Sequence, residues 1–381
     1  MAAASHRLLR HLSNIPGWTT DRHIVVIESD DWGSIRMPSV EVHEILIRCG
    51  MREDRNHYNT YDTIESNGDL ESLLDTLASF KDYNGNQVVM TGVNIVANPA
   101  FEKIRSSGFT EYHYEAFTDT LRRYPSRDKV LSLWREAIEQ RLFVPVFHGR
   151  EHLNVQRWLR SLKGGHKSTL LGFEYGLTGI QNGIDGEWVP NYQAAFDLDT
   201  PGDLPYMREV LQTGLSLFEE IFGYRTAYFV PPNGPFNNAL NSVLQGSGIR
   251  YVNTAKIQKE PEGDNTYRRH LRFIGQRNVY GQIYLTRNCI FEPSSMEYPA
   301  DTDWVGRCLN DIACAFQWHK PAIISTHRVN YIGALHPTNR RRGLFALRAL
   351  LSRMLTRWPT IEFMTSSELG DHIASTMTNN P

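Results

Sequence analysis

The chain has 381 residues, of which 41% are hydrophobic and 22% charged, a composition that excludes a largely disordered protein. Forty basic residues against 42 acidic ones leave a net charge of −2. We therefore expect no global attraction to nucleic acid or to an acidic membrane surface.

The N-terminal residues 1–18 contain no uninterrupted apolar stretch of signal-peptide length, because histidines and arginines break it up. Elsewhere no segment approaches the roughly 20 apolar residues that span a bilayer. The four cysteines, Cys49, Cys289, Cys308 and Cys314, show neither paired spacing nor a Cys-x-x-Cys motif. These features predict a cytoplasmic protein with reduced thiols and no transmembrane segment.

Short β-branched or aromatic runs predict buried strands. They lie at 23–31, 87–96, 142–150, 226–234, 249–255, 282–291, 322–331 and 361–369. Helical patterns lie between many of them, at 69–81, 127–141, 206–223, 303–319 and 341–358. This alternation predicts an α/β fold, a distorted TIM-like barrel of about seven parallel strands. No repeat or linker divides the chain, so we expect one domain over 1–381 with a loop insertion around 164–205.

The first predicted strand ends in two adjacent carboxylates, Asp30 and Asp31, where the apolar run stops. In α/β barrels the reactive groups lie at the C-terminal ends of the strands. Adjacent acids diverge in direction, so one could bind a metal while the other accepts a proton. A solvated turn or a helix cap is the alternative interpretation of this dipeptide.

The predicted strand at 142–150 ends in two imidazoles four residues apart, His148 and His152. This spacing puts both rings on one side of a turn, where they could share a first-row metal. Two histidines and one carboxylate leave coordination positions open, as a catalytic site requires. In a chain with 14 histidines, a chance pair is the alternative.

Two further strand ends carry candidate groups. The run at 226–234 ends in Pro231-Pro232-Asn233, a rigid turn from which Asn233 could present a backbone N–H to an oxyanion. The run at 322–331 contains His327, which is suited to protonating a leaving group. A plain loop and a structural histidine are the alternatives.

In this order the motifs resemble those of the NodB-homology polysaccharide deacetylases, within the glycoside hydrolase/deacetylase barrel superfamily. The resemblance covers roughly residues 24 to 330. It implies that Asp30 is the base, that Asp31, His148 and His152 hold a divalent metal, and that His327 is the general acid. The metal implied is usually zinc and sometimes cobalt or another first-row ion.

The family also has an Asp/Trp motif, and Asp301-Thr302-Asp303-Trp304 lies about where it is expected. The resemblance therefore implies that Asp303 or Asp301 orients the acid histidine, although a helix N-cap followed by a buried tryptophan explains the same residues. Trp32 and Trp304 are the candidates for stacking on a sugar, with core packing as the alternative.

One departure from the family pattern concerns the base. Where the family has Arg-Pro-Pro-Tyr, this chain has Val230-Pro231-Pro232-Asn233, so the arginine that normally supports the base is absent. We expect Arg150, Arg225 or Arg328 to replace it in space, or the base to be tuned differently.

Together these residues predict a metal-dependent hydrolase of non-peptide carbon–nitrogen bonds. The expected reaction removes an N-acyl group, and foremost an N-acetyl group, from a sugar or glycan precursor. Two alternatives stay open: another carbon–nitrogen hydrolase, such as a deformylase or cyclic amidase, and a catalytically impaired carbohydrate-binding barrel. The basic run 340–342 is expected at a solvated helix start and not at a nucleic-acid site. No oligomeric state is predicted.

Overall fold

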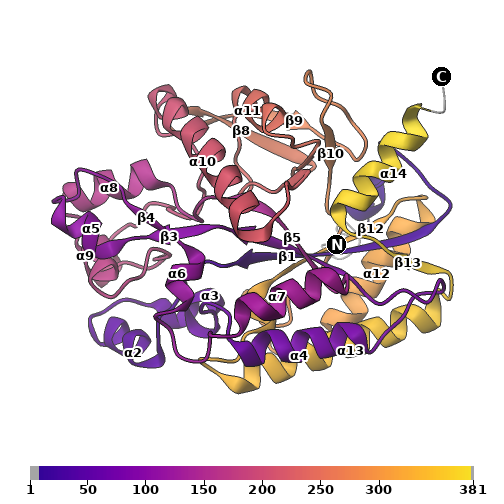
Figure 1. The fold of residues 1–381 in the computed structure, drawn as a ribbon, viewed down its shortest axis with the longest axis horizontal. Coiled ribbons are helices and arrows are strands. Elements are labelled where there is room, and N and C mark those ends of the chain that lie inside the picture. The colour runs from indigo at the N-terminus through magenta and orange to yellow at the C-terminus, as the bar shows by residue number, and fades with distance from the viewer. Residues whose placement is uncertain (1–7, 379–381) are drawn as a thin grey trace.

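One curled parallel sheet forms the centre of the molecule (Figure 1). The structure, a computed structural model, describes residues 8–378. Within them nine strands pair in the order β10-β7-β6-β5-β2-β1-β12-β11, with β13 beside the start of β1. Their bounds are β1 (His23–Trp32), β2 (Met90–Ile95), β5 (Phe143–Gly149), β6 (Tyr228–Phe229), β7 (Tyr251–Asn253), β10 (Ile283–Leu285), β11 (Cys289–Ile290), β12 (Ala322–His327) and β13 (Ile361–Phe363). The predicted α/β, TIM-like fold is confirmed, with nine strands where about seven were expected.

The two edge strands of the sheet, β10 and β11, are joined directly by a short segment of the chain. The run at 282–291 is not one strand, as predicted, but two: β10 pairs with β7 at one edge of the sheet, and β11 pairs with β12 at the other. Only residues 286–288 separate these strands, so the Cα atoms of Leu285 and Cys289 lie at most about 14 Å apart. The two edges therefore face each other across the space that Arg287 occupies.

The apolar residues of β1 alternate between the two faces of the sheet, as a strand requires. Ile24 and Val26 belong to an inner cluster to which β2, β5, β6, β7, β10 and β12 also contribute, together with Leu369 and Ile373 of α14. Val25 and Ile27 pack outward against helices that carry the larger outer core. Buried side chains of this kind each contribute about 1.5–3 kcal/mol to folding. The inner face of β1 continues toward Glu28 and Asp30.

Helices cover the outside of the sheet (Figure 1). The predicted helices are present as α4, α7, α10, α12 and α13. A capping box of Ser66 and Asp69 begins α4, and Gly223, at φ 77°, ends α10 in the left-handed conformation. The helix bounds are α2 (Val40–Arg48), α3 (His57–Tyr61), α4 (Asn67–Ala78), α5 (Phe101–Ser106), α6 (Phe117–Leu121), α7 (Val130–Glu139), α8 (Val155–Lys163), α9 (Lys167–Glu174), α10 (Leu204–Phe222), α11 (Asn241–Gly246), α12 (Trp304–Gln317), α13 (Pro337–Arg357) and α14 (Ser366–Thr378).

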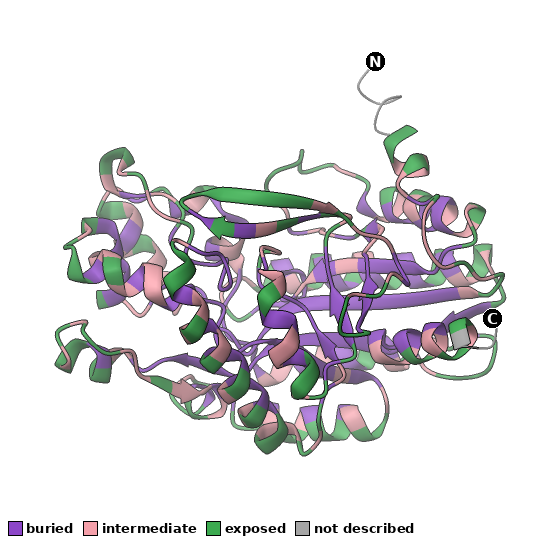
Figure 2. Cartoon of the chain, turned by 90° about the horizontal axis from the view of Figure 1, so that it is seen from above, coloured by how far each residue is buried: buried purple, intermediate pink, exposed green. Residues whose placement is uncertain are grey.

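Two antiparallel pairs lie outside the main sheet: β3 (Ala97–Pro99) with β4 (Tyr114–Ala116), and β8 (Ile257–Gly263) with β9 (Thr266–Leu271). Most residues of β9 are exposed, whereas β1 is buried almost throughout (Figure 2). The segment 164–205 contains α9, and its residues 192–198 are buried. One domain over 1–381 with an insertion at this segment stays a prediction.

The cysteines are free thiols, as expected. Among residues 8–378 no helix is both long and apolar enough to cross a membrane.

Candidate active site

Three predicted metal ligands converge at the C-terminal ends of β1 and β5. Asp31 Oδ1 lies 3.1 Å from His152 Nε2 and 3.6 Å from His148 Nε2, and all three side chains are buried. One ligand atom of each lies within 4.8 Å of those of the other two. The sequence placed these residues at strand ends, and the parallel sheet brings those ends together.

A local distortion of β1 aims Asp31 at this point. Strict alternation would turn Asp31 to the same side of the sheet as Val25 and Ile27, away from the interior. Asp31 instead has φ of 79°, and the register between β1 and β2 shifts between Ser29 and Trp32. A non-glycine residue in this conformation costs about 1–3 kcal/mol and persists only where its surroundings hold it. As a result Asp31, like Asp30, lines the cavity.

The protonation of these groups suits a divalent cation. The carbonyl oxygen of Val230 lies 2.7 Å from His148 Nδ1, and because a carbonyl can only accept, Nδ1 carries the proton and the lone pair of Nε2 faces Asp31. Burial lowers the pKa of His152 to about 4 although Asp31 opposes that shift, so His152 is neutral at neutral pH. Its Nδ1 has no hydrogen-bond partner among the described residues.

The carboxylate of Asp31 completes this set of donors. Burial would raise its pKa, but the charge of Arg36 is the largest influence against burial, and the pKa lies well below its usual range. One ionised carboxylate and two imidazoles on one side of a cavity are the donor set of an open first-row metal site. The residues present therefore fit a divalent metal ion.

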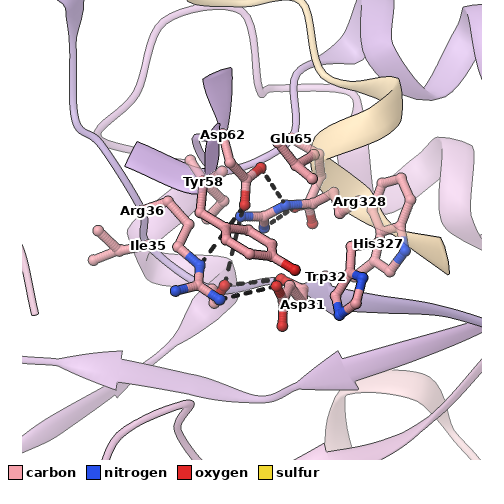
Figure 3. A network of polar contacts seen from close by, with 12 residues as sticks. Asp31, Trp32, Ile35, Arg36, Tyr58, Asp62, Glu65, His327 and Arg328 are labelled. Carbon is pink, nitrogen blue, oxygen red and sulfur yellow. Dashed lines mark hydrogen bonds and ion pairs between the residues drawn. The ribbon is translucent and has the colours of Figure 1, made fainter. Parts of the chain in front are cut away.

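A network of buried ion pairs supports Asp31 from behind (Figure 3). Arg36 donates to Asp31 Oδ2 at 2.9 Å and lies 3.7 Å from Asp62. Arg328, fully buried, joins Asp62 to Glu65 with contacts of 2.9 and 2.8 Å. Burial raises the pKa of Asp62 to about 6 despite these two guanidinium groups. The network fixes the second oxygen of Asp31, so that the first faces the histidines.

Asp30 is held by an arginine that the sequence did not reveal. Arg287 contacts both oxygens of Asp30, at 2.6 and 2.7 Å, and Glu28 at 2.5 Å. Burial would raise the pKa of Asp30, but the charge and hydrogen bonds of Arg287 outweigh it, and the pKa lies below its ordinary value. Arg287 therefore supplies, beside Asp30, the guanidinium group that the motif at Val230 lacks.

The three arginines expected to fill that role lie elsewhere. Arg150 is paired with its neighbour Glu151, Arg225 with Glu219, and Arg328 with the network behind Asp31. The prediction that one of them supports the base is therefore wrong. Arg287 lies in the middle of the predicted strand at 282–291, so no strand-end signal pointed to it.

His327 is paired with Asp30 across β1 and β12, and its Nε2 lies 3.9 Å from Asp30 Oδ2. Its Nδ1 lies 2.6 Å from Glu292 Oε1. Burial lowers the pKa of His327, but Glu292 and then Asp30 outweigh burial and raise it to about 9. The imidazole is therefore a cation at neutral pH, with Nε2–H available as a proton donor.

Glu292, not Asp303 or Asp301, contacts the ring of His327. Asp303 caps α12, where its carboxylate accepts a hydrogen bond of 2.8 Å from the N–H of Gly306, and no contact joins it to the histidine. Asp301 is exposed in the loop before that helix. The N-cap interpretation of this motif is the one the structure supports.

The two predicted substrate residues have different positions. Trp32 is fully buried, packs at 5.0 Å against Phe143 and donates to Ser29 Oγ at 3.0 Å, so it belongs to the core and does not line the cavity. Trp304 is also a core residue. Asn233 does line the cavity, with φ of 55°. Its role toward an oxyanion stays a prediction.

The cavity has a volume of about 1610 Å³. It is lined by the three candidate metal ligands and by Asp30, Arg287 and His327. Gln193, from the segment 164–205, adds a donor that sequence reasoning missed. Its Oε1 accepts from Arg36, which fixes the orientation of the amide, and its Nε2 has no partner in the described part of the chain.

No family model matches the chain, and no curated protein does. Among solved structures, a protein from Mycobacterium smegmatis named as a polysaccharide deacetylase shares 12% identity, with 95% of this chain and 94% of that chain covered and a TM-score of 0.45. One of the same designation from Pseudomonas aeruginosa PAO1 shares 10% identity, with 92% and 91% covered and a TM-score of 0.47. The PuuE allantoinase shares 11%, with 94% and 93% covered and a TM-score of 0.45.

Proposed function

We propose that this protein is a metal-dependent hydrolase that removes an N-acyl group, and foremost an N-acetyl group, from a sugar or glycan precursor. One observation carries the proposal. An open carboxylate–histidine–histidine site shares a cavity wall with a carboxylate, Asp30, and a protonated imidazole, His327. Amide hydrolysis needs a polarised carbonyl, a base and an acid at one place, and these residues supply all three functions.

Asp31, His148 and His152 would hold the metal, which when bound acts as a Lewis acid on the acyl oxygen. Asp30, ionised because of Arg287, accepts the proton of the attacking water. His327 donates the proton of Nε2 to the departing amine, while Glu292 holds the opposite nitrogen. The free amine and the carboxylic acid then leave.

The position of Arg287 favours turnover over the impaired-barrel alternative. That alternative was motivated by the missing motif arginine, and a guanidinium on both oxygens of Asp30 supplies the same charge from another strand end. Deformylation and cyclic-amide opening would use the same groups. The product of the reaction separates these chemistries: acetate, formate, or a ring-opened compound with no second product.

The test combines metal content with product release. The wild type, Asp31→Ala, His148→Ala and a control, His270→Ala on the β8–β9 hairpin, are purified, reconstituted with zinc or cobalt and assayed by plasma mass spectrometry. Acetate release is then measured on a panel of N-acetylated sugars. Stoichiometric metal in the wild type and control, lost from both ligand variants, together with acetate release, is the expected result. A wild type that holds no metal after reconstitution refutes the proposal.

A further inference from the structure

A second depression, of about 770 Å³, adjoins the catalytic cavity and has no role in the mechanism above. Asn233, Gly234 and Ala255 line both, so the two are continuous. We call this second depression the side groove. Its walls are α8, the segment 188–199 and the β8–β9 hairpin. A single bound ligand fills about 300–1,000 Å³, and the catalytic cavity alone already exceeds that range.

Two aromatic side chains at the side groove are exposed to solvent, one of them largely and the other in part. Trp188 lines it with 77% of its surface exposed, although tryptophan normally packs inside a protein. Tyr267 of β9 also lines it and is partly exposed. Flat apolar faces that remain in contact with water are where the C–H faces of a sugar ring stack.

One buried carboxylate oxygen at the side groove receives no hydrogen bond from residues 8–378. Asp197 is 6% exposed and lines the groove; its Oδ2 accepts hydrogen bonds from Arg157 and from the hydroxyl of Tyr267, at 3.1 and 2.9 Å. Its Oδ1 has no donor within the described residues. A buried carboxylate oxygen without a donor is costly, and a ligand hydroxyl would satisfy it.

Three cations, Arg157, Arg160 and Lys259, and three carboxylates, Asp197, Asp199 and Asp203, lie at or beside the side groove, so their charges largely cancel. Arg157 contacts Asp199 at 2.6 Å, and Arg160 contacts Asp199 at 2.9 Å and Asp203 at 3.0 Å. Guanidinium groups engaged in this way present little net field to a ligand. The site therefore favours a neutral, hydroxyl-bearing ring over a phosphate or a carboxylate.

We propose that the side groove binds a neutral pyranose unit joined to the unit at the metal centre, stacked on Trp188 and donating a hydroxyl to Asp197. The inference rests on the proposed function, which it deepens: the substrate is an oligosaccharide of at least two units and not a single sugar. Asn233 and Gly234, which border both cavities, lie where the linkage between the units passes.

The test is binding, measured apart from turnover. Isothermal titration of the metal-loaded protein uses N-acetylated β-1,4-glucosamine oligomers of one to five units, and cello-oligosaccharides of the same lengths, which have no acyl group to remove. The variants are Trp188→Ala, Trp188→Phe and, as a matched control, Phe345→Ala on α13, whose side chain is equally exposed at 77% and lies outside both cavities.

In the wild type, affinity should rise with oligomer length. Trp188→Ala should lose about fivefold or more of the oligomer affinity while its monomer affinity is unchanged, and Trp188→Phe should restore part of the loss. Affinity independent of length, or identical in Trp188→Ala and the wild type, overturns the inference. Length-dependent binding that Trp188→Ala removes, without any acetate release, supports the side groove while refuting the proposed reaction.

Discussion

Replacing Glu292 with glutamine should lower the pKa of His327, so that its ring is no longer protonated at mildly alkaline pH. Glu292 is the largest influence that raises the pKa of His327 to about 9, against a burial effect that lowers it. Without that charge the pKa should return toward 6.5, its ordinary value. At pH 8 the protonated fraction would fall from about 90% to about 3%, which makes hydrolysis about 30-fold slower, whereas at pH 6 the rate would change less than about twofold.

The same substitution has a signature in stability. Because the pKa of His327 is raised by folding, its pairing with Glu292 stabilises the protein fully below about pH 6.5, and that contribution is lost as the pH rises through about 9. Raising the pKa of His327 from 6.5 to about 9 corresponds to about 3 kcal/mol. Glu292→Gln should therefore lower the free energy of unfolding at pH 6 and leave it nearly unchanged at pH 10.

Two assays check this reasoning: kcat/KM for acetate release between pH 5 and 10, and an NMR titration of the His327 ring, which needs no turnover. Glu260→Gln is the matched control, since Glu260 lies 2.6 Å from His270 in a histidine–glutamate pair on the β8–β9 hairpin. An alkaline limb at the same pH in Glu292→Gln and the wild type would refute the assignment of the acid and its partner.

Three further substitutions test other contacts. Arg287→Met removes the guanidinium group from two buried carboxylates and should cost about 3–5 kcal/mol in urea unfolding at pH 7, with the zinc content retained; a loss of zinc would contradict the separation of base and ligands. Arg328→Met should cost a similar amount and weaken zinc binding about 10- to 100-fold in chelator competition, because the network behind Asp31 is broken. Gly343→Ala would set a Cβ 1.7 Å from the carbonyl oxygen of Asn330 and should lower the melting temperature by calorimetry; an unchanged value would show that α13 can shift.

The sequence was sufficient to predict that the three candidate metal ligands lie together, because each lies at or just beyond the end of a predicted strand. Parallel strands end at one edge, so Asp31, His148 and His152 had to lie near one another once the sheet was parallel. Trp32 failed as a substrate residue for a related reason. Because Trp32 is adjacent to Asp31, we expected it to line the cleft. The distortion that turns Asp31 toward the cavity instead leaves Trp32 in the core.

Arg287 and Glu292 escaped prediction because their positions depend on pairing across the barrel. Their run was interpreted as one strand, whereas the chain leaves one sheet edge and joins the other within it. The contact of Arg287 with Asp30 joins positions 257 residues apart, a separation about which local periodicity carries no information. Glu292 likewise meets His327 only because β11 lies beside β12.

The three-residue link between β10 and β11 has a consequence for how the protein is assembled. All three candidate metal ligands lie within residues 31–152, on strands in the middle of the sheet, whereas Arg287 and Glu292 come with the link and the strand after it. The candidate ligands are thus synthesised before Arg287 and Glu292. A nascent chain that ends before the link contains the three candidate ligands but lacks Arg328, which belongs to the network behind Asp31, as well as the partners of Asp30 and His327. The site is therefore complete only when the two edges of the sheet have met.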